Sequence, residues 1–413
     1  MDPADPARMV AAWQQDRIFG GGALGIVTAA SADGGFSWRR STPPLSVCSG
    51  GSYPRVSDPV ASVGPGVGGS PIVAFLSAIG VRADRRTDVI ASTSTDGGAN
   101  WNPPVVVRSA DDAIGGTDKE WLHTDSNRPG TAFLVWVEFP KPKAGEPRVF
   151  DVAFFSRTDD AGRTWSAPAE VYGALTETQF HQSAVLPDGT LYDAFTELRP
   201  RGGNGPAERI AVSRSADGGR TWGPAVTAAD FTYSIVERPG QRIRADSLQF
   251  GLTSTPGDGL AVLWIEDPTL GDHRVLFARS GDEGRTWSAP TVITSGQGAV
   301  FVPQLASANR GSLGALWYEV EPTAGPGLPT DVWFASSADG GAHWDRQHVA
   351  GPFDLDRAAP SPEGDFVGDY QGLAGLPDGF VLLWSMPHPL PRTSPATVFF
   401  TAARPRPPVL RLP

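Results

Sequence analysis

Ser215-Ala216-Asp217-Gly218-Gly219-Arg220-Thr221-Trp222 is the stretch that decides the fold, because the chain contains the same eight-residue pattern six times. Successive copies begin 57 to 65 residues apart, a period that fits a repeated unit of about four short strands with their connecting loops. The chain is therefore predicted to be a repeat array. The other five copies occupy residues 31–38, 94–101, 158–165, 280–287 and 337–344.

Each position of this octapeptide has a mechanical role in a tight turn. The Asp217 carboxylate can accept hydrogen bonds from nearby backbone N–H groups, and Gly218 and Gly219 can adopt a positive φ. The hydroxyls of Ser215 and Thr221 can close the turn by local hydrogen bonds. The tryptophan that ends each copy is expected to pack beneath its own turn, where it buries a large flat surface.

The pattern resembles the Asp-box, S-x-D-x-G-x-T-W, of sialidase-like (BNR-repeat) proteins. Six copies at regular spacing extend the resemblance over nearly the whole chain. The resemblance implies a β-propeller in which these turns are structural and lie far from the active site. We therefore expect residues 1–413 to form a single sialidase-like propeller domain.

Composition agrees with an all-β protein and limits its partners. The chain has 13 Trp and 20 Phe for a core, and its 49 Gly and 39 Pro fit many short strands joined by turns. The net charge of −11 argues against binding to nucleic acid or to an anionic membrane. A small-molecule or glycan substrate of negative charge would need a local basic pocket, and we expect a monomer.

Cysteine content and the start of the chain bear on location. Cys48 is the only cysteine, which excludes an internal disulfide, and we expect it to be a buried small hydrophobe. Insertion into a membrane is not expected, because no run of 18 apolar residues occurs, and residues 1–6 do not read as a signal peptide. Proteins of the family that the chain resembles are commonly exported. Location is therefore left open between secreted or periplasmic and cytoplasmic.

The fourth repeat shows the strand pattern best. Its four strands are predicted at residues 180–186, 190–196, 209–214 and 225–227, with the octapeptide between the third and the fourth. The first unit lacks an inner strand and the last lacks a fourth, so the units number seven. We predict a closed propeller of four-stranded antiparallel blades, seven of them, with six blades and surplus end strands as the alternative. The other inner strands are expected to begin near Arg55, Lys119, Arg244, Val302 and Phe366.

Several second strands end in an aromatic residue followed two positions later by glutamate. Strand alternation puts the two side chains on one face, so we expect these glutamates around the mouth of the propeller. The alternative is a structural role, in which each carboxylate accepts hydrogen bonds from a neighbouring blade. The pairs are Trp136 and Glu138, Phe195 and Glu197, Trp264 and Glu266, and Trp317 and Glu319.

The inner strands contribute arginines and further acids. Arg55, Arg242 and Arg244 could bind a carboxylate through the planar guanidinium fork, unless surface acids pair with them instead. We assign substrate binding to these arginines and to Glu138, Trp136, Trp264 and Trp317. Crowded carboxylates cannot all stay ionised, so one of them should become a proton donor. The catalytic candidates are Glu197, Glu266, Glu319, Asp58, Asp369 and Tyr370, and Asp118, Lys119 and Glu120 open the third inner strand.

The sialidase resemblance implies an arginine triad, an aspartic acid/base and a tyrosine nucleophile polarised by a glutamate. Tyr370 matches the nucleophile best and Tyr53 second, with Glu319 to accept the proton of Tyr370. The sequence departs from the family in one respect, because the arginine stretch expected before the first octapeptide is missing and its look-alike, residues 53–56, follows it. The arginine triad is therefore unidentified.

Metal and phosphate signals are weak. The six His residues show no metal-binding spacing, and His343 is expected to be part of its turn. Asp354, Asp356, Glu363 and Asp365 could surround Ca²⁺ on a loop, although a solvated acidic loop is the alternative, so no cofactor is predicted.

Three functions compete. The first is a sialidase-like glycoside hydrolase acting on an anionic or oxygen-rich glycan terminus at the mouth. The second is a carbohydrate-binding propeller without turnover. The third is a lyase, isomerase or cyclase in which a carboxylic acid at the mouth delivers a proton, because fold does not fix function.

Overall fold

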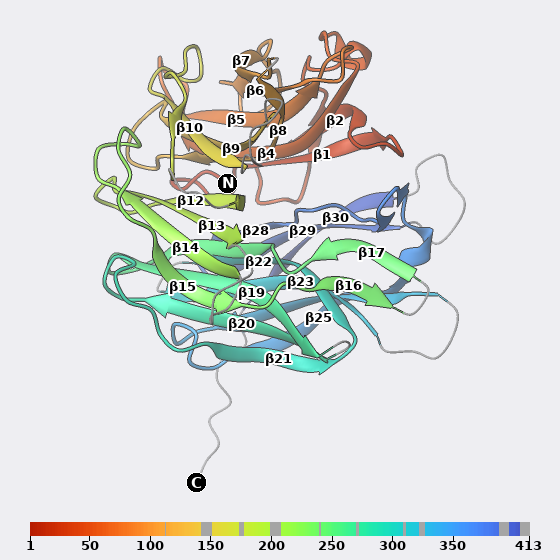
Figure 1. Ribbon diagram of the computed structural model, residues 1–413. Coiled ribbons are helices and arrows are strands. Elements are labelled where there is room, and N and C mark those ends of the chain that lie inside the picture. Colours follow the sequence, from red (N-terminus) through yellow and green to blue (C-terminus); the bar gives the residue numbers. More distant parts are fainter. Residues whose placement is uncertain are drawn as a thin grey trace. The chain divides into compact units, whose positions relative to one another are not determined.

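The computed structural model describes residues 1–111, 113–141, 151–172, 177–198, 208–238, 241–269, 272–308, 311–321, 327–387 and 396–404. In these ranges the protein is all-β, and its helices are two single 3-10 turns, η1 (Val47–Ser49) and η3 (Leu355–Arg357). The chain divides into two compact units (Figure 1). The first comprises Met1–Gly205 and Arg209–Val226, and the second Pro206–Glu208 and Thr227–Pro413.

The first unit is built from successive antiparallel sheets. One sheet has the order β1-β2-β4-β5-β6-β7 with β3 paired to β2, and a single residue pair, Ala23 and Val56, joins its two parts. The next sheets have the orders β11-β10-β9-β8 and β12-β13-β14-β15, and the chain enters the second unit at β15. The strands are β1 (Met9–Arg17), β2 (Ala23–Ser31), β3 (Arg39–Ser41), β4 (Arg55–Pro65), β5 (Ile72–Val81), β6 (Thr87–Ser94), β7 (Val105–Ser109), β8 (Ile114–Thr124), β9 (Ala132–Pro140), β10 (Val152–Thr158), β11 (Ala169–Glu170), β12 (Glu177–Val185), β13 (Leu191–Leu198), β14 (Glu208–Ser215) and β15 (Val226–Phe231).

The second unit continues the series. Its sheets have the orders β18-β19-β20-β21, β22-β23-β24-β25 and β28-β29-β30, and a smaller sheet has the order β16-β17-β27-β26. The strands are β16 (Ile235–Arg238), β17 (Gln241–Asp246), β18 (Phe250–Thr255), β19 (Gly259–Thr269), β20 (Asp272–Ser280), β21 (Thr291–Gln297), β22 (Ala299–Ser307), β23 (Leu313–Val320), β24 (Pro329–Ser337), β25 (Asp345–Asp354), β26 (Pro360–Ser361), β27 (Gly364–Asp365), β28 (Gly372–Leu376), β29 (Gly379–Pro387) and β30 (Ala396–Ala403).

The predicted strands of the fourth repeat agree with β12 to β15, but two expected inner strands are wrong. Arg244 lies on β17, in the smaller sheet, and the first strand of the following sheet is β18, which begins at Phe250. Phe366 follows β27, and the first strand of the last sheet, β28, begins only at Gly372. In both places the chain forms the smaller sheet, in which β17 and β27 pair in parallel, before it enters the next large one.

The second strands carry the core. Residues 132–137 of β9 and residues 72–76 of β5 are buried on both faces of their sheets, which is why these strands are apolar without alternation. Aromatic rings fill the space between neighbouring sheets, as where Phe334 of β24 packs against Phe380 of β29 with ring centroids 5.4 Å apart. Cys48 does not belong to the core: it is exposed on η1, so the expectation that it is buried was wrong.

All six octapeptides form the same hydrogen-bonded turn. In each, the hydroxyl of the first residue accepts a hydrogen bond from the N–H of the fifth at 2.8 to 3.0 Å. The aspartate accepts one from the N–H of the seventh residue at 2.9 Å. His343 takes the place of the usual Thr hydroxyl, with its Nδ1 2.7 Å from the Asp339 carboxylate, which confirms its predicted role in the turn.

The turns also contact the sheet that precedes them in the chain. Trp222 packs edge-on against Phe155 of β10, with ring centroids 5.4 Å apart, and Trp344 contacts Phe277 of β20 in the same way at 5.3 Å. Trp38, Trp287 and Trp344 also donate to a carbonyl of their own turn, at 3.0 to 3.2 Å, so the contact with the preceding sheet adds to the contact predicted with the turn itself. Gly219 is needed for the same approach, because its φ is 83° and an added Cβ would lie 2.0 Å from Cε1 of Phe155.

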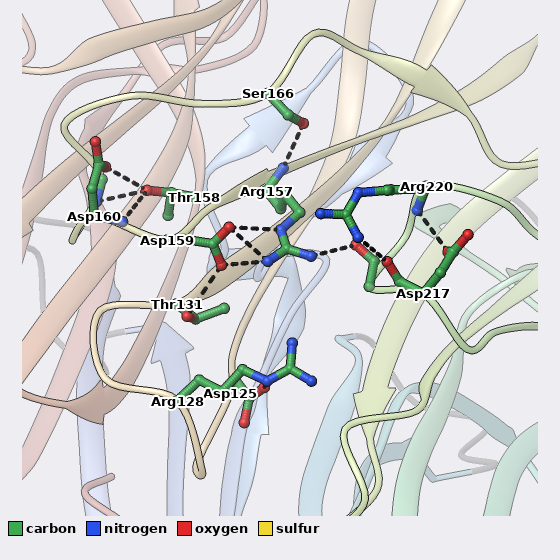
Figure 2. A network of polar contacts seen from close by, with 12 residues as sticks. Asp125, Arg128, Thr131, Arg157, Thr158, Asp159, Asp160, Ser166, Asp217 and Arg220 are labelled. Atoms are coloured by element: carbon green, nitrogen blue, oxygen red, sulfur yellow. Dashed lines mark hydrogen bonds and ion pairs between the residues drawn. The ribbon is translucent and has the colours of Figure 1, made fainter.

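An arginine repeats this contact between sheets. Figure 2 shows Arg157, held by the carboxylate of Asp159, reaching across to the turn that contains Asp217 and Arg220. Its guanidinium donates to the carbonyl of Gly218 at 3.1 Å, and Arg279 donates to the carbonyl of Gly340 at 2.8 Å in the second unit. These contacts fix the spacing of consecutive sheets, and so position the strands at the start of each sheet.

Candidate functional site

The first strands of four sheets each contain a β-bulge at an equivalent position. The pairing of β4, β12 and β22 with the second strand shifts register once, and that of β8 shifts twice, the second time between Asp118 and Trp121. The first bulged residue has a positive φ in all four, between 50° and 55°, although none is glycine. Such backbone costs of the order of 1–3 kcal/mol per residue and is concentrated at functional sites. The four residues are Asp58, Lys119, Phe180 and Val302.

Three of these bulges belong to the first unit, and two of them bring unlike side chains into contact. The Lys119 ammonium lies over the Phe180 ring, 4.9 Å from its centroid. Asp58 is largely buried and accepts hydrogen bonds from Ser57 Oγ at 2.6 Å and Gln14 Nε2 at 3.4 Å. We call Asp58, Lys119 and Phe180 the bulge cluster.

Glu120 is the second bulged residue of β8 and is coupled to the cluster. Its side chain is fully buried, and neither carboxylate oxygen has a hydrogen-bond partner among the described residues. Burial, and secondly the charge of Asp58, raise the pKa of Glu120 well above its ordinary value. Glu120 therefore holds its proton at pH values at which an ordinary glutamate is ionised.

His181 occupies the same bulge position on β12. Its Nδ1 lies 2.6 Å from the carboxylate of Asp193, both side chains are buried, and its ring stacks on Phe195 with centroids 4.9 Å apart. Burial raises the pKa of Asp193, against the opposing effect of His181. The Nε2 atom of His181 has no hydrogen-bond partner in the part of the chain that the structure describes. If Nδ1 carries the proton, Nε2 is left as a base.

The predicted glutamates at the ends of the second strands all pair with arginine. Glu138 is bound by two nitrogens of Arg108, at 2.6 and 3.0 Å, and by Trp136 Nε1 at 3.1 Å. The remaining pairs are Glu197 with Arg209, Glu266 with Arg274 at 3.0 Å, and Glu319 with Arg346. Of the four glutamates, Glu138 alone takes its arginine from another sheet, at β7, as the structural alternative expected; the arginines of the other three lie on β14, β20 and β25 of the same sheet as their glutamate.

The predicted tryptophans lie in the packed interior of their units. Trp136, Trp264 and Trp317 are at most 1% exposed. Trp136 and Trp317 are the residues opposite the bulges of β8 and β22, because the register skips them. The aromatic residue of the second strand thus supports the bulge of the first.

Of the predicted arginines, two have described side chains. Arg55 donates to the backbone carbonyls of Gly20 and Gly21, at 3.4 and 3.0 Å. Arg244 lies over the Phe366 ring, 4.2 Å from its centroid, with its Nε 3.1 Å from the Glu363 carboxylate. The side chain of Arg242 lies outside the described residues.

The structure brings together one predicted pair in the second unit. Arg244 lies 3.7 Å from the carboxylate of Asp369. Asp369 and Tyr370 precede β28 instead of lying on a first strand as expected. Gln371, the next residue, donates to the carbonyl of Val302 at 3.0 Å and so ties this segment to the bulge of β22.

The alternative nucleophile, Tyr53, is committed to a buried network. Its hydroxyl donates to Asp88 at 2.9 Å, and Asp88 also accepts from Ser109 and lies 3.4 Å from Arg82. Burial and the hydrogen bond to Asp88 raise the pKa of Tyr53. The phenol therefore stays protonated.

Glu120 and His181 were missed as site residues. A charged triplet, Asp118-Lys119-Glu120, inside a first strand was the available signal, since a regular strand would leave one of its charges buried without a partner. The same reasoning applies to His181, which follows Phe180 within β12.

The described residues form neither a metal-binding cluster nor a membrane-spanning helix. No group of three or more His, Cys, Asp or Glu side chains that could hold a metal is found among the described residues. Asp354 instead accepts hydrogen bonds from the N–H groups of Leu328 and Asp356. The described helices include none that is long and apolar enough to cross a membrane.

The chain is similar to known proteins in part of its sequence and in its fold. No family model matches the chain. A sialidase of Micromonospora viridifaciens is 28% identical over 228 residues, which are 50% of this chain and 32% of that protein. The chain thus matches about a third of the length of its curated relative.

Three solved structures share the fold. A Hadza microbial sialidase matches with a TM-score of 0.50 at 17% identity, covering 85% of this chain and 66% of that one. A Dyadobacter fermentans protein of unknown function gives 0.53 at 16% identity, covering 85% and 95%. An ulvan lyase gives 0.51 at 11% identity, covering 81% and 78%. The chain has a sialidase-like fold, as the six octapeptides predicted.

Proposed function

We propose that this protein is a sialidase-like glycoside hydrolase that binds an anionic or oxygen-rich glycan terminus at the mouth of a propeller, with its six octapeptides as Asp-box turns. The observation that carries the proposal is the bulge cluster, in which equivalent bulges of three first strands present a carboxylate, an ammonium group and an aromatic ring. The hydroxyl groups of a sugar can donate to the carboxylate, its acidic substituent can pair with the ammonium group, and its C–H face can pack on the aromatic ring.

Each member of the cluster has a chemical role in this proposal. Asp58 protonates the glycosidic oxygen as the bond breaks and then activates water. Lys119 attracts the acidic group of the sugar, and Phe180 supports the ring. In the second unit, Tyr370 is kept separately as the nucleophile that the family resemblance implies, because a neutral phenol can attack an anomeric centre beside a carboxylate without charge repulsion. Arg244, next to Asp369, is the proposed guanidinium for carboxylate recognition.

The similarity to sialidases supports the same substrate class. The M. viridifaciens protein and the Hadza structure are both sialidases by name. The ulvan lyase shows that the fold also serves elimination on an anionic polysaccharide. Fold alone therefore leaves the reaction open, and the proposal depends on the residues of the bulge cluster.

A panel of chromogenic glycosides, sialosides first, tests the proposal beside a glycan array. Asp58→Asn should lower kcat/KM by about 10²–10⁴, the usual contribution of a general acid, with little change in Tm. Tyr370→Phe should lower kcat, and Lys119→Gln should weaken binding of anionic substrates. Glu170→Gln, at the opposite edge of the β8 sheet, is the matched control. Wild-type rates in all three site variants would refute the assignment.

A second candidate, a lyase, is favoured by His181. A histidine whose Nδ1 is held by a buried aspartate, and whose Nε2 is without a described partner, is suited to remove a proton next to a carboxylate. Elimination would yield an unsaturated sugar that absorbs in the ultraviolet, whereas hydrolysis would not. Binding on the array without either product would instead support a carbohydrate-binding protein.

A further inference from the structure

Residues 366–371 carry Asp369 and Tyr370 but belong to no strand. They lie between β27 and β28, so the hydrogen-bond ladder of a sheet does not fix their backbone. Gly368 lies in the middle of the segment with a φ of 123°, a conformation that residues with a side chain rarely adopt. The path of the segment therefore depends on the contacts that side chains make with it.

Two buried glutamines supply such contacts, and we call Gln249 and Gln371 the amide pair. Nε2 of Gln249 donates to the backbone carbonyl of Asp369 at 3.1 Å. Nε2 of Gln371 donates to the carbonyl of Val302, in the bulge of β22, at 3.0 Å. Gln249 directly precedes β18 and Gln371 directly precedes β28, and both side chains are at most 8% exposed. The amide pair thus connects the segment to the first strands of three sheets of the second unit.

The same hydrogen bonds fix the orientation of each carboxamide. A backbone carbonyl can only accept, so the atom that faces it must be Nε2, and Oε1 must face the other way. In the part of the chain that the structure describes, neither Oε1 atom has a hydrogen-bond partner. An apolar side chain of equal length would avoid burying that oxygen, but it would leave the backbone carbonyl without its donor. The two glutamines are therefore explained by the hydrogen bonds that they donate.

We infer that the amide pair positions Asp369 and Tyr370. Gln249 holds the backbone of Asp369 where its carboxylate lies 3.7 Å from the Arg244 guanidinium. Tyr370 follows directly and is joined on its other side to Gln371, so the contacts of the amide pair lie on both sides of it in the chain. The catalytic consequence, that the pair aligns Tyr370 and Arg244 for reaction, rests on the proposed function, whereas the placement of Tyr370 does not.

Fluorine NMR tests the placement without a substrate. 3-Fluorotyrosine can replace the six tyrosines, and the Tyr370 resonance is the one that Tyr370→Phe lacks. Gln249→Met and Gln371→Met keep the length of the side chain but donate no hydrogen bond, so each should shift or broaden that resonance. Gln347→Met is the matched control, because Gln347 donates to the carbonyl of Arg404, outside the segment. An unmoved Tyr370 resonance in both site variants would overturn the inference, even if their melting temperatures fell.

Gln249→Glu tests the hydrogen bond within one folded protein. A protonated carboxyl can donate to the Asp369 carbonyl, whereas a carboxylate cannot. The Tyr370 resonance should therefore match that of wild type at about pH 4, where the new carboxyl is held neutral by burial, and depart from it as the pH rises through the pKa of that carboxyl. Gln347→Glu should show no such change. A resonance that stays at its wild-type position after the new carboxyl has ionised, as its infrared band reports, would overturn the inference.

Turnover separates the inference from the proposed function. If Tyr370 reacts with a glycoside, Gln371→Met should lower kcat by about 10²-fold with a smaller change in KM, because a displaced reacting group loses its alignment. Gln347→Met should keep the wild-type rate. An unchanged kcat in Gln371→Met, with a shifted Tyr370 resonance, would contradict the proposed role of Tyr370 and support its placement by the amide pair. If no glycoside is turned over, the proposed function fails, and the fluorine spectra alone decide the inference.

Discussion

The repeated turns and the first-strand bulges are both periodic, but they repeat different properties. The turns repeat side chains: the aspartate accepts the same hydrogen bond at 2.9 Å in all six copies. The bulges repeat only backbone, with φ near 50° on Asp58, Lys119, Phe180 and Val302. A repeat protein can change a side chain without altering its fold at positions where the repeats share only a backbone conformation. The bulges are therefore where the side-chain chemistry differs from one repeat of this chain to the next.

The largest expected effect lies in the turns. Trp222→Ala should lower the free energy of unfolding by about 3–5 kcal/mol, because it removes a large ring that packs on Phe155 of the preceding sheet. Denaturant unfolding measures the loss. Phe36→Ser, in the first turn, is the control, since Phe36 is 95% exposed. An unchanged midpoint for Trp222→Ala would mean that the turns do not hold the sheets.

The two regions should also respond oppositely to pH. Hydrogen bonds from the Thr221 side chain and backbone lower the pKa of Asp217 to about 2, so its stabilisation is present above pH 4 and is lost as the pH falls towards 2. Burial raises the pKa of Glu120, so its folded state loses stability as the pH rises above the ordinary glutamate value. Unfolding midpoints across pH should show a weaker acid loss in Asp217→Asn and a weaker alkaline loss in Glu120→Gln. If Asp217→Asn instead weakened the alkaline loss of stability and Glu120→Gln the acid loss, the predicted opposite pH responses would be wrong.

The smallest expected effect on stability comes from the bulges. Lys119→Gly should change the free energy of unfolding by about 1 kcal/mol or less, because glycine relieves the positive φ while the contact with Phe180 is lost. Binding of anionic glycans should nevertheless fall on the array. The matching exchange in a turn, Gly219→Ala, should destabilise much more, because the new Cβ would overlap Phe155. Equal losses in the free energy of unfolding for Lys119→Gly and Gly219→Ala would show that bulges and turns contribute alike to stability.

The fold was predictable from the sequence because side chains define the turns, and the octapeptides reveal them directly. The bulges were not predictable, since a one-residue shift in register changes neither composition nor the apolar pattern around it. For the same reason Glu120 was read as one of three acids or bases at the start of a strand. The first strands near Arg244 and Phe366 were misplaced because two short strands, β17 and β27, pair with each other before the large sheets begin. Cys48 was misjudged because residue type alone does not reveal a surface 3-10 turn.

The contacts of the turns with the preceding sheet imply an order in which the sheets are stabilised during synthesis. Arg157 of β10 and Phe155 beside it meet their partners, Gly218 and Trp222, only when the following repeat is present. On the ribosome, a newly made sheet would wait for about one further repeat, 57 to 65 residues, before it is clamped. Chain termination just before a turn should therefore leave the sheet before it unclamped. Because Trp222 and Trp344 contact the sheet that precedes them, each of these sheets is completed by the repeat that is synthesised after it.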